Sequence, residues 1–375
     1  MMHIGWKHLR RDPLRAGVAV TGIVFSVILI TLETGLLSGL MRNASLLIDS
    51  SRADLWITAQ DVPTIDFSTP LESRQKFRIE ATPGIEKVEE FSCSYSVWKL
   101  ANGTNANVQI TGLDLRGTLG PTVQVVEGNV DDLLLRDTIM IDQSDRERLG
   151  NPGIGDTVEI YNHRARIVGF TRHMKTFTTI PYVFTNQHSF HSYSFLGGFE
   201  KPISLLIKIA PGFSADEIKK SIMANVPGVE VYSSEEFSWR TRRYWLIETG
   251  MGIGFLGAAL LGLLVGGVIV SQTLYAMTLE KLPEYAVLKA MGASMSEVAL
   301  VVFEQGLVCG VVGVSCGLGV SVLLVHVALH AGTIIEISLP LIFMVTLVTM
   351  ILCIGAALVS VVRLYRVEPA MVFRS

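Results

Sequence analysis

Two histidines, His188 and His191, come nearest in this sequence to the type and spacing of metal ligands. Neutral imidazole is the commonest metal ligand among protein side chains. The pair stands in an expected loop, and the four cysteines have no spacing typical of a zinc site. We therefore interpret both residues as surface histidines, and we predict no metal site and no cofactor bound by this chain.

The short motifs of ATP-dependent and metal-dependent enzymes are missing. The sequence has no Gly-Lys pair, which excludes the P-loop pattern Gly-x-x-x-x-Gly-Lys-Ser/Thr, and it has no His-Glu-x-x-His. Its net charge of −3 offers no basic excess for nucleic acid. We predict a non-catalytic chain. Because catalytic residues need not stand in short motifs, an ATP-independent membrane enzyme or sensor stays open as an alternative.

Two carboxylates, Glu33 and Glu304, stand inside long apolar runs. A charged side chain in hydrocarbon is costly and usually faces a protein partner or a cavity. Gly35 and Gly39 follow Glu33 as Gly-x-x-x-Gly, a pattern typical of close helix packing. Glu33 is either a substrate or gating contact or a side chain that reaches the outer interface, and we favour the second. For Glu304, near the start of its run, we expect an interfacial or dimer contact.

Long apolar runs dominate the composition. Hydrophobic residues make up 49% of the chain and charged residues only 17%, against about 25% charged residues in an ordinary soluble domain. A helix crosses the hydrocarbon with about 20 apolar residues, and four runs reach that length. The predicted fold is an α-helical bundle of four transmembrane helices, with a mixed α/β extracytoplasmic domain inserted between the first and second helix.

The distribution of Lys and Arg predicts the orientation of these helices. Cytoplasmic loops carry an excess of basic residues. The segments before the first run, between the second and third, and after the fourth are basic, whereas residues 330–336 hold no Lys or Arg. Both termini are therefore expected in the cytoplasm. The second run is also rich in glycine, which is typical of a homodimer interface or of packing within the bundle.

The segment between the first two runs is long enough to bury a core of its own. Asn102-Gly103 predicts a hairpin turn, and a second hairpin is expected around residues 162–164. Ser214 and Glu217 have the spacing of a capping box at a helix start. The aromatic residues that precede the second run fit an interfacial belt, on a helix that continues outward as a stalk. They are Trp239, Tyr244 and Trp245.

These observations divide the chain into nine segments. The predicted order is a basic cytoplasmic segment (1–15), transmembrane helix 1 (16–41), the extracytoplasmic domain (42–245), transmembrane helix 2 (246–279), a cytoplasmic helix and loop (280–297), transmembrane helix 3 (298–329), a short outer loop (330–336), transmembrane helix 4 (337–362) and a cytoplasmic tail (363–375).

The loop after the second run has a pattern of its own. It reads Leu-Glu-Lys-Leu-Pro-Glu-Tyr-Ala-Val-Leu-Lys-Ala-Met-Gly-Ala-Ser over residues 279–294. Tyr285, Leu288 and Met291 would share one face of a short helix, and Gly292 is typical of a residue just past a helix end. A helix with such an apolar face needs either a protein partner or the lipid headgroups to cover it.

This loop resembles the acidic-aliphatic-Lys/Arg-Ala-x-Gly-Ala segment of the FtsX/MacB-type permeases, the type VII ABC transporters. The tail Arg-Val-Glu-Pro-Ala-Met-Val-Phe-Arg at 366–374 is similar to the family's x-x-Asp-Pro-Ala-x-x-Leu-Arg, with Glu368 for Asp and Phe373 for Leu. The order of one helix, an outer domain and three helices covers the whole chain. Residues 15–60 are closest in character to the DevC-like exporter permeases.

The resemblance implies an outer domain like the MacB periplasmic core and a home in the bacterial inner membrane. It implies two copies of an ABC ATPase, which carry the ATP, a second copy of this chain, the lipid bilayer and often a membrane-fusion adaptor as partners. It also implies which residues contact the ATPase. They are Glu280, Pro283, Glu284, Leu288, Lys289, Ala290, Gly292 and Ala293.

The expected function is that of a permease subunit which couples ATP hydrolysis on a separate chain to motion of the extracytoplasmic domain. This mechanotransmission would export a lipid, glycolipid, lipopeptide, hydrophobic drug or haem. The alternative within the family is an FtsX-like regulator, which uses the same stroke to activate an envelope hydrolase and transports no substrate.

Overall fold

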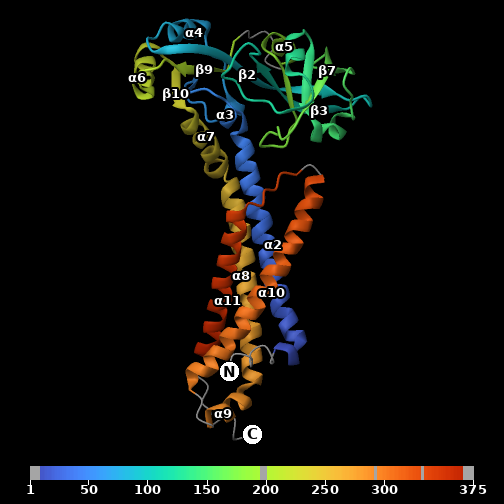
Figure 1. The fold of residues 1–375 in the computed structure, drawn as a ribbon, viewed down its shortest axis with the longest axis vertical. Helices are drawn as coiled ribbons and strands as arrows, with labels where there is room; N and C mark the ends of the chain where they lie inside the picture. The colour runs from blue at the N-terminus through green and yellow to red at the C-terminus, as the bar shows by residue number, and fades with distance from the viewer. Residues whose placement is uncertain (1–8, 195–200, 291–293, 331–332, 366–375) are drawn as a thin grey trace. The chain divides into compact units, whose positions relative to one another are not determined.

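The computed structural model describes residues 9–194, 201–290, 294–330 and 333–365. The chain divides into two compact units (Figure 1). A helical unit combines Met1–Gly39 with Met251–Ser375, and an outer domain comprises Leu40–Gly250. Gly292, Ala293 and the tail 366–374 belong to the predictions above and lie outside the described residues.

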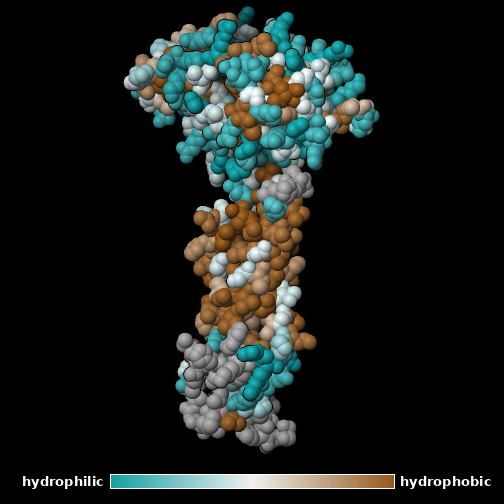
Figure 2. Space-filling model, turned by 45° about the vertical axis from the view of Figure 1, so that its right-hand side comes forward, coloured by the Kyte–Doolittle hydropathy of each residue, from teal (hydrophilic) through white to brown (hydrophobic). Residues whose placement is uncertain are grey.

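The helical unit contains four helices long and apolar enough to cross a membrane, which confirms the predicted bundle. Figure 2 shows apolar side chains over much of the face of this unit that is in view. Glu33 does not interrupt the first helix. The long helices are α2 (Pro13–Ala44), α8 (Met251–Glu280), α10 (Met295–His330) and α11 (Leu339–Tyr365), with the short α9 (Leu282–Ala290) between α8 and α10.

Glycines let these helices approach closely. The Ser26 hydroxyl of α2 donates to the Gly262 carbonyl of α8 at 2.7 Å, and a Cβ on Gly266 would lie 1.7 Å from the Ser26 oxygen. By contrast, Gly254 and Gly257 have no other described residue within 4 Å of a Cβ. The glycines of α8 therefore serve packing within the bundle on one face and leave another face open.

The outer domain is built on a ten-stranded mixed sheet in the order β10-β1-β9-β2-β3-β8-β5-β7-β4, with β6 beside β2 and β7. β2 (Ile85–Lys99) joins its two lobes, because its first half pairs with β9 and its second half with β3. The other strands are β1 (Leu55–Ala59), β3 (Asn105–Leu113), β4 (Val125–Gly128), β5 (Thr138–Asp142), β6 (Thr157–Ile160), β7 (His163–Thr171), β8 (Tyr182–Asn186), β9 (Ser204–Ile209) and β10 (Val229–Ser233).

Each lobe has its own core. In the first lobe, formed by β10, β1, β9 and the start of β2, α4 and α6 cover one face of the sheet and α3 and α7 the other (Figure 1). In the second lobe, Trp98 and Tyr193 are buried among aliphatic side chains. The helices are α3 (Leu46–Asp49), α4 (Ser73–Glu80), α5 (Gln187–Tyr193), α6 (Ala215–Asn225) and α7 (Ser234–Arg243).

Both predicted hairpins are present. β2 and β3 flank the Asn102-Gly103 turn, and β6 and β7 meet at Tyr161 and Asn162, whose φ values are 48° and 63°. The capping box predicted at Ser214 is wrong. Ser214 occupies the N-cap position, but its hydroxyl makes no cap hydrogen bond. A capping box forms instead at Ser233, where α7 begins.

Candidate coupling sites

The short helix α9 lies between two candidate membrane spans. Pro283 is its second residue. Backbone N–H groups in the first turn of a helix have no acceptor within the helix, so a proline there costs no helix hydrogen bond. Lys281 and Glu284 form an ion pair at 2.6 Å. Glu280, the last residue of α8, pairs with Arg15 near the start of α2. The first pair is local to the α9 segment, and the second joins the end of α8, where this segment begins, to α2.

One side chain anchors α9 to α10. Tyr285 is 4% exposed, and its side chain lies beside Gln305 of α10. Burial and the neighbouring Glu284 raise the pKa of Tyr285 to about 12. Glu284 and Val287 are exposed, so α9 presents a carboxylate and an apolar side chain outward. The structure describes the backbone of α9 as far as Ala290 but not the side chains from Leu288 onward.

A second site lies where the outer domain leads into α8. Residues Tyr244–Glu248 form a π-helical turn between α7 and α8, a departure from regular helix that is often found at functional positions. Trp245 in this turn is 8% exposed. The interfacial belt predicted for it is therefore wrong, because the indole packs inside the domain. Of the three aromatics, Trp239 is the exposed one, at 62%.

Aromatic side chains from both lobes hold Trp245. Phe177, in the loop between β7 and β8, stacks on the indole with ring centroids 4.2 Å apart and planes at 22°. Phe67 lies between β1 and α4 of the first lobe, and its ring centroid is 5.9 Å from that of Trp245. Asp66 lies beside this cluster and accepts from Gln109 of β3 at 3.0 Å. Burial raises the pKa of the Asp66 carboxyl, and hydrogen bonds from Gln109 and Thr64 offset part of that rise.

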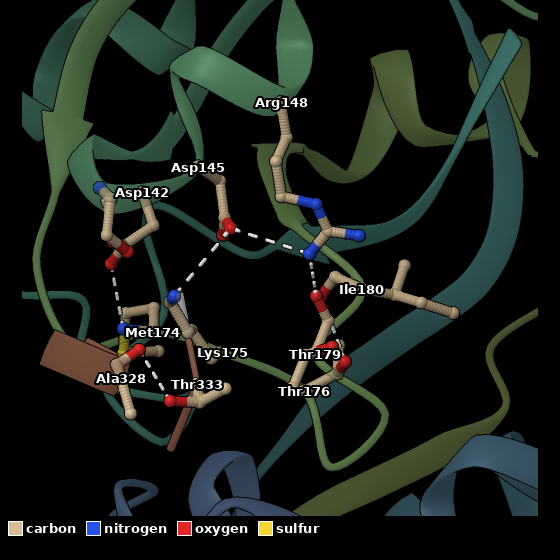
Figure 3. A network of polar contacts seen from close by, with 11 residues as sticks. Asp142, Asp145, Arg148, Met174, Lys175, Thr176, Thr179, Ile180, Ala328 and Thr333 are labelled. Atoms are coloured by element: carbon tan, nitrogen blue, oxygen red, sulfur yellow. Dashed lines mark hydrogen bonds and ion pairs between the residues drawn. The ribbon is translucent and has the colours of Figure 1, made fainter. Parts of the chain in front are cut away.

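The loop that carries Phe177 is held by one buried carboxylate and two cations (Figure 3). Asp145 is fully buried, and its carboxylate lies 3.9 Å from both Lys175 and Arg148. Arg148 also donates to the carbonyl of Thr179. Burial is the main cause that raises the pKa of Asp145 to about 6, although the two cations lower it.

A backbone contact completes this attachment. Asp142 accepts from the Met174 backbone N–H at 2.8 Å. The loop 172–181 is therefore fixed to β5 and its following turn at one side, and stacks on Trp245 through Phe177 at the other. We call Trp245, Phe177, Phe67 and Asp66 the Trp245 junction.

Two family models match this chain. The model described as MacB-like periplasmic core domain matches residues 16–225, and the model described as FtsX-like permease C-terminal matches residues 256–369. The first alone spans more than half of the chain. The protein belongs to the FtsX/MacB-type permease family. Membership makes it a multi-pass membrane subunit of an ABC-type transporter, whose ATPase lies on a partner chain.

Solved structures of outer domains show similarity at low sequence identity. The periplasmic region of MacB from Actinobacillus actinomycetemcomitans is 15% identical with a TM-score of 0.36, covering 50% of this chain and 92% of that one. The extracellular domain of the transporter YknZ from Gram-positive bacteria is 13% identical with a TM-score of 0.35, covering 48% and 99%.

A domain of a putative permease from Porphyromonas gingivalis is 14% identical with a TM-score of 0.31, covering 50% of this chain and 89% of that one. A comparison with curated proteins found no match.

The two membrane carboxylates of this permease lie toward the ends of the helical unit. Glu33 is half-buried, two residues before Gly35, whose carbonyl accepts from the Glu336 N–H at 3.0 Å. Glu336 belongs to the segment that joins α10 to α11. Glu33 thus lies about half a helical turn from the Gly35 contact with that loop, and its interfacial interpretation stays a prediction. Glu304 is half-buried beside Gln305, the residue that α9 contacts.

The histidine pair lies on α5 and not in a loop as expected. The guanidinium of Arg136 contacts Nε2 of His188, and a cation at this nitrogen opposes a metal ion. Within the described residues, no group of three or more His, Cys, Asp or Glu side chains is placed to hold a metal. His191 is half-buried beside Phe190.

A Gly-x-Ser-x-Gly sequence at residues 313–317 of the permease has no hydrolase geometry. A nucleophile elbow requires a sharp turn between a strand and a helix. Here the serine, Ser315, lies in the middle of α10 and donates to the Val311 carbonyl at 2.8 Å. Its flanking glycines pack against α2, where Cβ atoms on Gly313 and Gly317 would meet Ile23 and Val27.

Proposed function

We propose that this permease couples ATP hydrolysis on two copies of a separate ATPase to motion of its outer domain, and thereby exports a lipid, glycolipid or other hydrophobic substrate from the bacterial inner membrane. The observation that carries the proposal is the Trp245 junction. It joins both lobes of the outer domain to the helical segment that runs on into α8.

The proposed coupling pathway runs from the ATPase to the outer domain, and its cytoplasmic end is α9. Its exposed Glu284 and Val287 offer an ion-pairing group beside an apolar contact, a combination that suits docking on a folded partner. Tyr285 is buried beside Gln305 of α10, and the Glu280–Arg15 pair holds the end of α8, from which α9 follows, to α2. A displacement of α9 by the ATPase would therefore move the ends of α8 and α10 with it.

The outer end of the pathway is the π-helical turn. Because Trp245 is buried between aromatic side chains of both lobes, a rotation or shift of α7 and α8 has to carry these side chains or break the stack. The loop 172–181 passes the displacement to the second lobe through Asp142 and Asp145. The outer domain then acts on a substrate that is already outside the cytoplasm.

A second copy of the chain fits the open face of α8. Ile253, Leu256, Leu260, Leu261 and Leu264 are each more than half exposed, and Gly254 and Gly257 lie among them. Small residues within an apolar helix surface let two backbones approach closely in the membrane. We therefore propose α8 as part of the homodimer interface.

Affinity purification of the tagged chain in mild detergent, followed by mass spectrometry, tests the proposal. The expected result is a stoichiometric P-loop ATPase, with or without a membrane-fusion adaptor. Recovery of the chain alone, repeated across detergents and with ATP present, contradicts it. If an envelope hydrolase co-purifies and its activity depends on the ATPase while no efflux is measurable, the FtsX-like regulatory function replaces export.

A further inference from the structure

A cleft in the first lobe of the outer domain lies between α6, β10 and α7. It has a volume of about 520 Å³. Glu236, Trp239, Arg240 and Arg243 line it from α7, at a spacing of three and four residues that places them on one helix face. The opposite wall is formed by Lys219 and Met223 of α6, and Val231 and Tyr232 contribute the floor.

Two of the three cations in this cleft already have partners. Lys219 pairs with Glu236 at 2.5 Å. Arg240 donates to the Val62 carbonyl at 3.1 Å and lies over the Tyr232 ring.

Arg243 differs from these two cations. It is exposed and forms no hydrogen bond or ion pair with any described residue. Glu248 also lines the cleft without pairing with Arg243. The lining thus holds three cations and two carboxylates, and Arg243 is the cation still available to an anion.

The rim of the cleft is apolar. Trp239 is 62% exposed and Met223 is 49% exposed, on opposite walls. An indole has an apolar body and a polar tip, and it favours the headgroup level of a membrane. A free guanidinium beside such a rim matches a molecule with an anionic head and an apolar chain.

The cleft also stays within reach of the membrane. Arg243 precedes Met251, the first residue of the apolar helix α8, by eight residues. Eight residues of fully extended chain span at most about 28 Å, so Arg243 cannot lie farther than this from the start of α8. This bound holds whatever the angle between the two units.

From the free arginine, the apolar rim and this short connection, we propose that the α6–α7 cleft binds one anionic phospholipid of the outer leaflet. The phosphate lies against Arg243, and the upper part of an acyl chain lies along Trp239 and Met223. The bound lipid would hold α7, the helix that leads along the chain into α8, at the membrane surface. This inference goes beyond the proposed function, because it needs neither an ATPase nor a transported substrate.

Brominated lipids test the proposal on the full chain in nanodiscs. Brominated chains quench nearby tryptophan fluorescence, and within the described residues Trp239 is the exposed tryptophan, since Trp56, Trp98 and Trp245 are buried. The Trp239 signal is the difference between the wild type and Trp239→Phe. We expect brominated phosphatidylglycerol to quench this signal more strongly than brominated phosphatidylcholine at the same density. Equal quenching by both lipids overturns the proposal.

Lipid retention gives an independent measurement. Native mass spectrometry of the chain released from mixed nanodiscs counts the bound lipids. One basic residue at a membrane surface contributes about 1 kcal/mol with anionic lipid, which predicts an approximately fivefold preference for phosphatidylglycerol over phosphatidylcholine. Arg243→Gln should lower the retention of phosphatidylglycerol by the share that belongs to the cleft, while the basic segments at the other ends of the membrane helices keep theirs. Arg116→Gln, at an exposed arginine of the other lobe, should leave retention unchanged. Equal retention of phosphatidylglycerol by the wild type and Arg243→Gln contradicts the proposal.

Discussion

Trp245 and Phe177 come from segments far apart in the sequence and share one stacked contact. A stacked aromatic pair contributes about 0.5–1.5 kcal/mol beyond the area it buries. A double-mutant cycle with Phe177→Ala and Trp245→Ala, followed by chemical unfolding of the outer domain in the full chain, should therefore give a coupling free energy of about 1 kcal/mol. Each single variant should lose about 3–5 kcal/mol as a buried aromatic residue. Additive effects would show that the stack does not form.

Asp145 makes the stability of the second lobe depend on pH. Its pKa is raised to about 6, from about 3.9 in an unfolded chain, so between these values the folded state binds more protons. The free energy of unfolding should then fall as the pH rises from about 4 to about 6, by about 3 kcal/mol from this group. Thermal unfolding as a function of pH should show this slope in the wild type.

The matched variant for Asp145 is Asp145→Asn, which keeps the shape of the side chain and cannot ionise. Its unfolding temperature should change less than that of the wild type between pH 4 and 6. An identical slope in both proteins would assign the pH dependence to other groups.

Sequence reasoning could not place Trp245 or Asp145 in the fold. Trp245 stands among aromatics before an apolar run, which is typical of a membrane interface, whereas the structure buries it against Phe177, 68 positions earlier. Asp145 and Lys175 likewise carry no local pattern that predicts their contact. Asp145 and Lys175 come together because β5 pairs with β7 and β8.

Among the secondary-structure elements, α9 is the one whose surface charges have a predicted function. Glu284 is exposed, and Lys289 follows it on the same helix. Reversing both charges, as Glu284→Lys with Lys289→Glu, should weaken association with the ATPase and lower ATP hydrolysis in the purified complex. Glu217→Lys, an exposed residue of α6 in the outer domain, serves as control. Unchanged association and activity in the double variant would exclude α9 as the contact.

The two faces of α8 should respond differently to larger side chains. A Cβ on Gly266 would already collide with Ser26 of α2, so Gly266→Leu should prevent recovery of a folded, monodisperse chain. Gly254 has open space around it among the described residues, so Gly254→Leu should leave the chain folded and weaken the dimer. Size-exclusion chromatography with light scattering measures both outcomes. A folded Gly266→Leu variant would contradict the close packing of α2 on α8.

Elements with a strong local signal were predictable, and breaks within them were not. Apolar length alone predicts the four membrane helices, and Asn102-Gly103 predicts the β2–β3 hairpin. The π-helical turn at Tyr244–Glu248 has no such signal. The bend that follows at Gly250, where φ is +74°, lies at the start of a continuous apolar run and has no local sequence signal either. The α9 helix was predicted from its apolar spacing, while its anchor, Tyr285 on Gln305, depends on how α10 packs.

For the whole molecule, the order of segments is a stronger guide to the fold and the family than any single residue. One apolar helix, a long polar segment and three apolar helices define both the fold and the family. Division of the outer domain into two lobes that share β2 could not be predicted, since it depends on one strand pairing with β9 along its first half and β3 along its second. The proposed coupling depends on this division, because the Trp245 junction spans both lobes.

The most direct test of this coupling is a distance between the two outer domains of the dimer. A spin label at Asn102→Cys, in the exposed β2–β3 turn, reports it by pulsed electron paramagnetic resonance once the exposed Cys316 is replaced by serine. We predict that ATP shifts the distance distribution of the complex with its ATPase, and that Phe177→Ala reduces this shift while ATP hydrolysis continues. A distribution that stays unchanged in the wild type while the bound ATPase hydrolyses ATP would contradict mechanical coupling.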